Sequence, residues 1–153
     1  MIGVMRNRGF TLPELMIVIT ILAVMLAAGV PTLAEFVRNQ RVKTASFDLL
    51  STLVFARSEA ITRNATVKVE PATANTWAAG WTVKDAGGTV LRTLEPTPNV
   101  AIAGPANVEF RGSGRLVTTT VPTFELTSTG ANVTSRCIRV DLSGRPTTKA
   151  ATC

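Results

Sequence analysis

Hydrophobic residues dominate the first part of the chain and form one long, almost uninterrupted run. From Phe10 to Val30 there are twenty-one residues, and Glu14 is the only charged one. Such a run predicts a helix that is long enough to cross most of a bilayer at about 1.5 Å per residue. Pro31 then removes one backbone hydrogen bond, so we expect a kink or a local loosening there. Residues 10–31 are therefore predicted as the membrane-spanning half of a longer helix.

Beyond Pro31 the apolar residues return at spacings of three and four, the pattern of an amphipathic helix. Polar residues stand between them, among them Arg41, Lys43, Asp48 and Glu59. We predict a second helical half over residues 32–64, ending near Asn64, with its apolar face packed on the rest of the protein. That face is predicted to contain Leu33, Phe36, Val37, Phe47, Leu50, Leu53, Val54 and Ile61.

After Asn64 the spacing of apolar residues changes to two and β-branched residues become frequent, which indicates strands. Residues 85–88 are a turn signal between two alternating segments and predict a β-hairpin, while residues 143–146 have the composition of a second turn. Short strands separated by turns predict an α+β fold, in which residues 65–153 form a β-rich domain that covers the helix. The predicted strands are residues 67–69, 81–84, 89–94, 100–102, 108–110, 116–120, 124–127 and 137–142.

The isolated carboxylate of Glu14 indicates a function. An ionised side chain in hydrocarbon costs roughly 2.5–3.5 kcal/mol on insertion scales, so a residue of this kind needs a partner. Cleavage between Gly9 and Phe10 would supply one, because the new amino terminus would be positively charged and Glu14 would be the fifth residue of the mature chain. A secretory signal peptide or an ordinary membrane anchor explains the hydrophobic run but not Glu14.

The segment from Arg8 to Leu15, RGFTLPEL, resembles the cleavage and assembly signal of type IV prepilins and of type II secretion pseudopilins. The resemblance implies that a prepilin peptidase removes the leader, residues 1–9, by cutting after Gly9, and then methylates the amine of Phe10. It also implies that Glu14 pairs with the Phe10 amine of a neighbouring subunit during assembly. The basic leader should stay in the cytoplasm, with the rest of this single-pass chain facing outward from the inner membrane.

A second segment is similar to the GspH/FimT group of minor pilins and pseudopilins. It runs from Leu53 to Asn64, LVFARSEAITRN, and continues with the strand at residues 67–69 and with Gly80 and Trp81. The similarity implies a type IV pilin-like fold, with a long N-terminal α-helix whose C-terminal half packs against two small antiparallel β-sheets. In such a protein the apolar helix half would join the filament core, among other pilin subunits.

This group leaves two roles open. One is a minor subunit of a type IV pilus, carried to the cell surface, where some FimT-like proteins bind DNA during natural transformation. The other is a GspH-type minor pseudopilin of a type II secretion system, with no DNA-binding role.

FimT-like proteins that bind DNA carry a Gly-Arg-x-Arg motif in the C-terminal tail, near a cysteine bridge. Gly144 and Arg145 match that motif here, whereas Thr147 occupies the second arginine position and the next cation is Lys149. Residues 111–153 contain six basic and two acidic residues and so contribute +4 to the formal net charge of +6. A one-sided basic segment is typical of polyanion binding, although solvated cations or contacts to acidic neighbouring pilins are the alternative.

Duplex DNA held through its phosphates is the expected ligand, because no aromatic residue follows Phe124 to stack on single-stranded bases. Arginine side chains bind phosphate bidentately, so they are the natural candidates. The candidate DNA-binding residues are Arg111, Arg115, Arg136, Arg139, Arg145 and Lys149.

Cys137 and Cys153 are the only cysteines. In an exported domain such a pair predicts a disulfide, the alternative being two buried free thiols. Closing a loop of about fifteen residues would contribute on the order of 3 kcal/mol and would hold the C-terminal tail in place.

Enzymatic activity has little support in the sequence. The chain has no histidine, which excludes Ser–His and Cys–His nucleophile pairs and removes the commonest transition-metal ligand. Carboxylates occur singly, and neither a phosphate-binding loop nor a dinucleotide motif is present. We therefore expect no catalytic residue, no metal site and no cofactor. Trp77 and Trp81 could form a sugar-binding platform, but packing in the core is the expected role.

Overall fold

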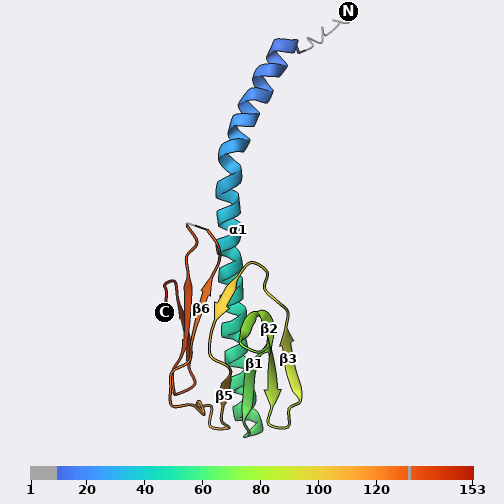
Figure 1. Ribbon diagram of the computed structural model, residues 1–153. Helices are drawn as coiled ribbons and strands as arrows, with labels where there is room; N and C mark the ends of the chain where they lie inside the picture. The colour runs from blue at the N-terminus through green and yellow to red at the C-terminus, as the bar shows by residue number, and fades with distance from the viewer. Residues whose placement is uncertain (1–9, 131) are drawn as a thin grey trace, which may run out of the picture. The chain divides into compact units, whose positions relative to one another are not determined.

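A computed structural model describes residues 10–130 and 132–153, with the side chains of residues 27–32 excepted. One helix, α1 (Leu12–Arg63, 52 residues), precedes eight strands (Figure 1). The chain forms two compact units, Met1–Ala34 and Glu35–Cys153. The predicted leader, including the cleavage residue Gly9, lies outside the described residues.

The described part of the first unit is helical from Leu12 onward, and the large apolar side chains from Phe10 to Leu26 are all more than half exposed. The helix continues through Pro31, so the proline does not end it. Among the residues that the structure describes, no helix is both long and apolar enough to cross a membrane. The membrane-spanning half at residues 10–31 therefore stays a prediction.

The end of α1 is set by Asn64. Its φ angle of 48° lies in the left-handed region, which asparagine tolerates better than most residues. The amide of Ala65 then donates to the carbonyl of Ala60 at 3.2 Å and satisfies one of the last free carbonyls of the helix. The predicted end near Asn64 is confirmed.

The second unit packs the later part of α1 against two four-stranded antiparallel sheets (Figure 1). The strand order is β3-β2-β1-β5 in the first sheet and β4-β6-β7-β8 in the second. The first sheet contains β1 (Val67–Thr73), β2 (Thr76–Asp85), β3 (Val90–Leu94) and β5 (Val108–Phe110). The second contains β4 (Ala101–Ala103), β6 (Thr123–Thr127), β7 (Arg136–Val140) and β8 (Pro146–Lys149). The predicted α+β fold, with a long helix packed against antiparallel sheets, and the β2–β3 hairpin are confirmed.

One predicted strand is absent from the structure, and one observed strand was not predicted. Residues 116–120 form no strand, and only Leu116 makes a bridge, to Phe110. The hydroxyl of Thr118 instead accepts the amide of Thr120 at 3.1 Å, so threonine side chains here compete with a strand ladder. Strand β8 was not predicted, because its residues, PTTK, show no apolar alternation.

The predicted apolar face of the helix was also largely wrong. The buried stripe consists mainly of small and medium residues, since these let the helix approach both sheets closely. Leu53 belongs to both the predicted and the observed face, whereas Phe47, Val54 and Ile61 are 50–52% exposed. Among the side chains of α1 that the structure describes, the buried apolar residues are Val42, Ala45, Leu49, Leu53, Ala56 and Ala60.

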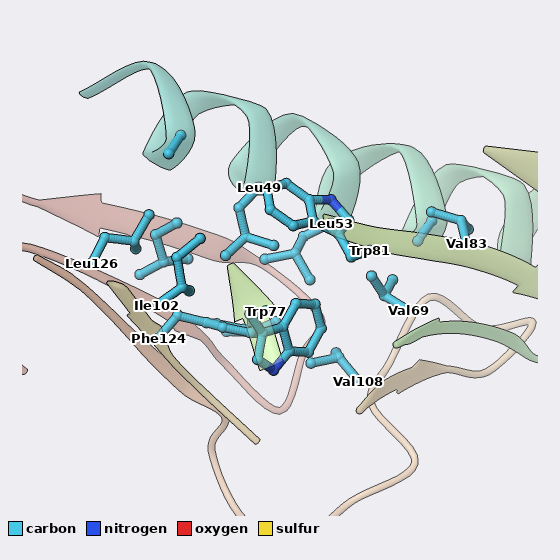
Figure 2. Close-up of a cluster of buried hydrophobic side chains, with 14 of the residues drawn as sticks. Leu49, Leu53, Val69, Trp77, Trp81, Val83, Ile102, Val108, Phe124 and Leu126 are labelled. Atoms are coloured by element: carbon cyan, nitrogen blue, oxygen red, sulfur yellow. The ribbon is translucent and has the colours of Figure 1, made fainter. Parts of the chain in front are cut away.

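Two tryptophans fill the space between the helix and the sheets (Figure 2). The indole N–H of Trp81 donates to the buried hydroxyl of Thr52 on α1 at 3.2 Å, and that of Trp77 donates to the carbonyl of Pro105 at 2.7 Å. Trp77 also meets Phe124 of β6 edge to face, with ring centroids 4.8 Å apart. Both indoles are buried with their polar atoms satisfied, which confirms a core role.

Candidate functional site

The first turn of α1 is held by the glutamate half of a capping box, formed by residues next to the predicted cleavage position. The carboxylate of Glu14 accepts the backbone N–H of Thr11 at 3.3 Å and its hydroxyl at 3.4 Å. The carbonyl of Thr11 accepts the amide of Leu15 at 3.1 Å and begins the helix. This role of Glu14 was not predicted, although the pattern Thr-x-x-Glu before an apolar run is its signature. Glu14 and Phe10 are both exposed, which leaves them available to other chains.

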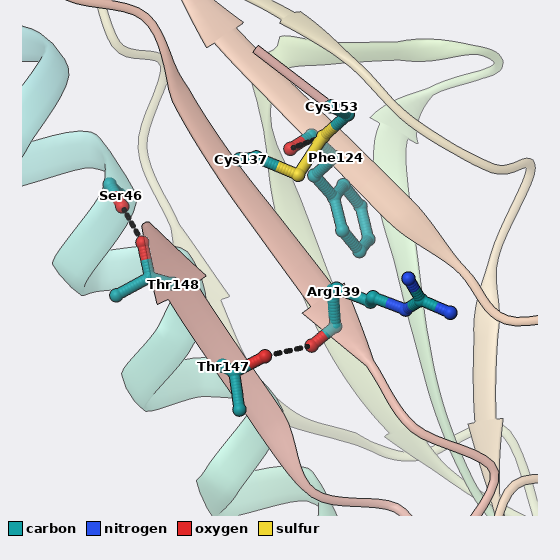
Figure 3. The surroundings of a disulfide bond; sticks show 7 residues. All are labelled: Ser46, Phe124, Cys137, Arg139, Thr147, Thr148 and Cys153. Carbon is teal, nitrogen blue, oxygen red and sulfur yellow. Dashed lines mark hydrogen bonds between the residues drawn. A yellow bond between two sulfur atoms is a disulfide. The ribbon is translucent and has the colours of Figure 1, made fainter. Parts of the chain in front are cut away.

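A disulfide closes the C-terminal tail, as the cysteine count predicts. It joins Cys137 of β7 to Cys153, sixteen positions later, across a Cα–Cα distance of 5.1 Å (Figure 3). Cys153 also lies against β6, with its sulfur 3.2 Å from the carbonyl oxygen of Phe124. The bridge therefore fixes the tail to the second sheet just after β8.

Two of the candidate DNA-binding cations share the exposed face of the second sheet. Arg139 pairs with Thr147, and Cys137 pairs with Lys149, in the register of β7 and β8. Because side chains alternate along a strand, Arg139 and Lys149 lie on the same face, with Arg139 directed away from α1 in Figure 3. The opposite face meets the helix, where the hydroxyl of Thr148 lies 3.2 Å from that of Ser46.

Arg136 lies apart from these two cations. It is an odd number of positions from Arg139 along β7 and therefore belongs to the face that meets the helix. Its guanidinium lies 6.0 Å from the ring centroid of Phe47, a cation–π distance that accounts for its position without any ligand. The structure thus separates Arg136 from the other candidates.

The remaining candidates, Arg111, Arg115 and Arg145, lie on two neighbouring turns. The turn at residues 111–115 follows β5 of the first sheet, and the turn at residues 141–145 joins β7 to β8 of the second. The amide of Leu116 donates to the carbonyl of Leu142 at 3.3 Å, so the turns lie side by side. The turn that carries Arg111 and Arg115 therefore lies next to the turn that carries Arg145.

The two sheets differ in how their surface charges are balanced. On the first sheet, hydrogen bonds from Lys84 and Lys68 hold the pKa of Glu70 below its usual value, and the hydrogen bond to Glu70 raises the pKa of Lys68. The nitrogen–oxygen distances are 2.6 Å from Lys84 and 2.9 Å from Lys68. Glu125 and Asp141 are the acidic residues of the second sheet and its turns, and no ion pair to either occurs among the described residues. In residues 10–130 and 132–153, no cluster of three metal-binding side chains occurs.

Comparison with solved structures identifies the fold. Two crystal forms of the type IV minor pilin FimU from Pseudomonas aeruginosa strain PAO1 superpose on this chain with TM-scores of 0.65 and 0.60, each at 21% sequence identity. The first covers 74% of this chain and 92% of FimU, and the second covers 70% and 91%. No curated protein matches the sequence.

The sequence itself carries two family signatures. Residues 4–30 match the prokaryotic N-terminal methylation motif. Together with the fold, this motif defines a protein of the type IV pilin and pseudopilin class. Within that class, residues 45–144 match the family described as type II transport protein GspH, and the chain belongs to that family. Membership implies a membrane-anchored precursor that a prepilin peptidase processes and that assembles with other pilin subunits.

Proposed function

We propose that the chain is a minor pilin of a type IV pilus. A prepilin peptidase would cut between Gly9 and Phe10 and methylate the new amine, and the mature chain would wait in the inner membrane with its C-terminal domain in the periplasm. Assembly would then carry it into a pilus at the cell surface. The observation that carries this proposal is the methylation motif over residues 4–30, which includes the start of an exposed apolar helix whose first carboxylate is Glu14.

We further propose that this pilin binds duplex DNA through phosphates. The support is the placement of cations on the second sheet, with Arg139 and Lys149 on its exposed face and Arg145 on the adjoining turn. Arg139 stands directly opposite Thr147, so a cation occupies the neighbourhood in which Thr147 replaces the second arginine of the Gly-Arg-x-Arg motif. Arg136 does not belong to this set, because it packs on Phe47.

Processing is tested by co-expressing the full chain with a prepilin peptidase and measuring the mass of the product. The expected product lacks residues 1–9 and carries one methyl group on Phe10. Retention of the leader would contradict the proposal, and a Gly9→Val variant, which should remain uncut, is the control.

DNA binding is tested by titrating labelled duplex with the mature chain in a neutral detergent at two salt concentrations. Binding that weakens steeply with salt is expected, because each phosphate contact releases counterions. Replacing Arg139 and Lys149 with alanine should weaken it further. Arg136→Ala is the matched control, since Arg136 shares β7 with Arg139 but lies on the other face.

A GspH-type pseudopilin of a type II secretion system is the second candidate, because the matching family is described as a type II transport protein. Deletion of the coding sequence in the source bacterium separates the two roles. Loss of surface pili or of transformation would support the pilus, whereas loss of protein secretion with intact pili would support the pseudopilus.

A further inference from the structure

The two turns at the end of the sheets repeat the same three residues. Ser113-Gly114-Arg115 follows the short strand β5, and Ser143-Gly144-Arg145 precedes β8. The first lies in the segment RGSGRL and the second in DLSGRP, thirty positions later in the chain. We call residues 111–115 and 141–145 the twin turns.

The twin turns also have the same backbone geometry. In each turn, the backbone amide of the first residue donates to the carbonyl of the last. The distance is 2.8 Å from Arg111 to Arg115 and 3.0 Å from Asp141 to Arg145. In each, the glycine amide donates back to the carbonyl of the first residue at 2.7 Å. Gly114 and Gly144 have φ angles of 74° and 80°, which most other residues avoid. The two arginines therefore leave their turns from equivalent backbone positions.

The twin turns are packed directly against one another through their glycines. A Cβ on Gly144 would collide with the carbonyl oxygen of Gly114, and a Cβ on Gly114 would collide with the side chain of Ile61 of α1, so neither glycine leaves room for a side chain. Arg57 of α1 locks the pair in place, because its Nε donates to that same carbonyl at 3.1 Å. A helix and both sheets thus fix the relative position of Arg115 and Arg145.

The surface of this pair is polar and basic. Ser113, Arg115, Ser143 and Arg145 are all exposed, as is Arg111 at the start of the first turn. Asp141 is the only acidic residue in the ten positions of the twin turns, against three arginines. Exposed guanidinium and hydroxyl groups of this kind are the usual donors to phosphate oxygens in protein–DNA complexes.

We propose that the twin turns form one composite phosphate-binding site for the backbone of duplex nucleic acid, in which Arg115 and Arg145 act as an equivalent pair. This inference rests on the DNA-binding function proposed above and adds to it the partner of Arg145. The second arginine of the site comes from a turn of the other sheet rather than from the position of Thr147. Hydrogen bonds fix the backbone of both turns before binding, so the ordering cost falls on the arginine side chains alone.

The test is a salt series of duplex-DNA titrations with the mature full-length chain in neutral detergent. The variants are Arg115→Ala, Arg145→Ala and the double variant, with Arg92→Ala as the control because its guanidinium packs over Phe55, 5.6 Å from the ring centroid. Each single variant should lower the affinity to a similar extent. Each should also reduce the slope of log K against log salt concentration by about 0.9, and the double variant should reduce it by about twice as much. Circular dichroism of each variant checks that the fold is unchanged.

Several results would overturn the inference. If Arg145→Ala weakens binding while Arg115→Ala does not, the C-terminal turn acts alone, and the DNA-binding function stands without the composite site. If neither variant matters but removal of Arg139 and Lys149 does, the ligand lies on the sheet face. If the wild-type chain binds no duplex even at low salt, the proposed DNA-binding function fails and the composite site fails with it.

Discussion

Arg139 and Thr147 are direct cross-strand partners at the exposed face of the second sheet, and the Thr147 hydroxyl donates to the Arg139 carbonyl at 3.3 Å. Thr147 holds the position at which the resemblance to FimT-like proteins implies a second arginine. Arg139 of β7 therefore lies directly beside Thr147 of β8, the position at which this chain has no second arginine.

Replacing Thr147 with arginine should strengthen DNA binding and weaken the fold slightly. The new guanidinium adds one phosphate contact, which should steepen the salt slope by about 0.9. It also places two like charges directly opposite one another, at a cost of about 0.2–1 kcal/mol. Paired titrations and denaturant unfolding measure the two effects, with Thr147→Ser as a neutral control. An unchanged salt slope would show that this face does not contact DNA.

Glu14 has two roles that a pair of substitutions separates. A glutamine retains the oxygen that accepts the Thr11 amide but removes the charge, whereas an alanine removes both. If Glu14 pairs with the Phe10 amine of a neighbouring subunit, both variants should be cleaved normally and both should be poorly incorporated into filaments. Quantitative immunoblots of sheared pili measure this incorporation. Normal incorporation of Glu14→Gln, with a defect only in Glu14→Ala, would assign the effect to helix capping.

Reduction of the disulfide should destabilise the second unit. The bridge closes a loop of about fifteen residues, so its loss should cost on the order of 3 kcal/mol in the chain-entropy model. Thermal melts with and without a reductant measure the change, and a Cys137→Ser, Cys153→Ser double variant should melt at the reduced value in both conditions. An unchanged melting temperature would mean that the tail adds nothing to stability.

The sequence predicted those parts of the fold that depend on local patterns. Asn64 ended the helix as expected, and the alternation around Trp81 together with the turn before Thr89 located a hairpin. In contrast, the buried helix face was not predictable from hydrophobicity, because Ala45, Ala56 and Ala60 are chosen for size rather than for apolar area. Which face of an amphipathic helix is buried depends on the shape of the sheets that cover it.

The candidate site was predictable only as a set of residues. Net charge located the basic segment, but the strand predicted at residues 137–142 left out Arg136, so the alternation that puts it on the face opposite to Arg139 was not applied to it. The contact between Gly114 and Gly144 joins turns of different sheets, so no periodic pattern in the sequence indicates it. The repeated Ser-Gly-Arg triplet was visible in the sequence and was the signal that could have indicated the pair.

A matched pair of core and surface substitutions tests the observed helix face. Leu53 is fully buried, whereas its neighbour Val54 is 52% exposed. Leu53→Ala should therefore lower the free energy of unfolding by about 2–5 kcal/mol, and Val54→Ala should change it by about 0.5 kcal/mol or less. Denaturant unfolding of the mature chain in detergent measures both. Comparable losses for the two variants would contradict the buried stripe.

The ion pairs of Glu70 predict how stability changes in acid. Hydrogen bonds from Lys84 and then from Lys68 lower the pKa of Glu70 in the folded state below its usual value of 4.5. A lowered folded pKa contributes stability that is present above pH 4.5 and is lost as the pH falls from there through the folded value. The side chains are partly exposed, so the contribution should be at most about 1 kcal/mol.

Glu70→Gln should accordingly flatten the loss of stability below pH 4.5, measured as the unfolding free energy against pH. Glu95→Gln serves as the control, because Glu95 forms no ion pair with any residue that the structure describes. An equal flattening in both variants would mean that the network around Glu70 makes no specific contribution.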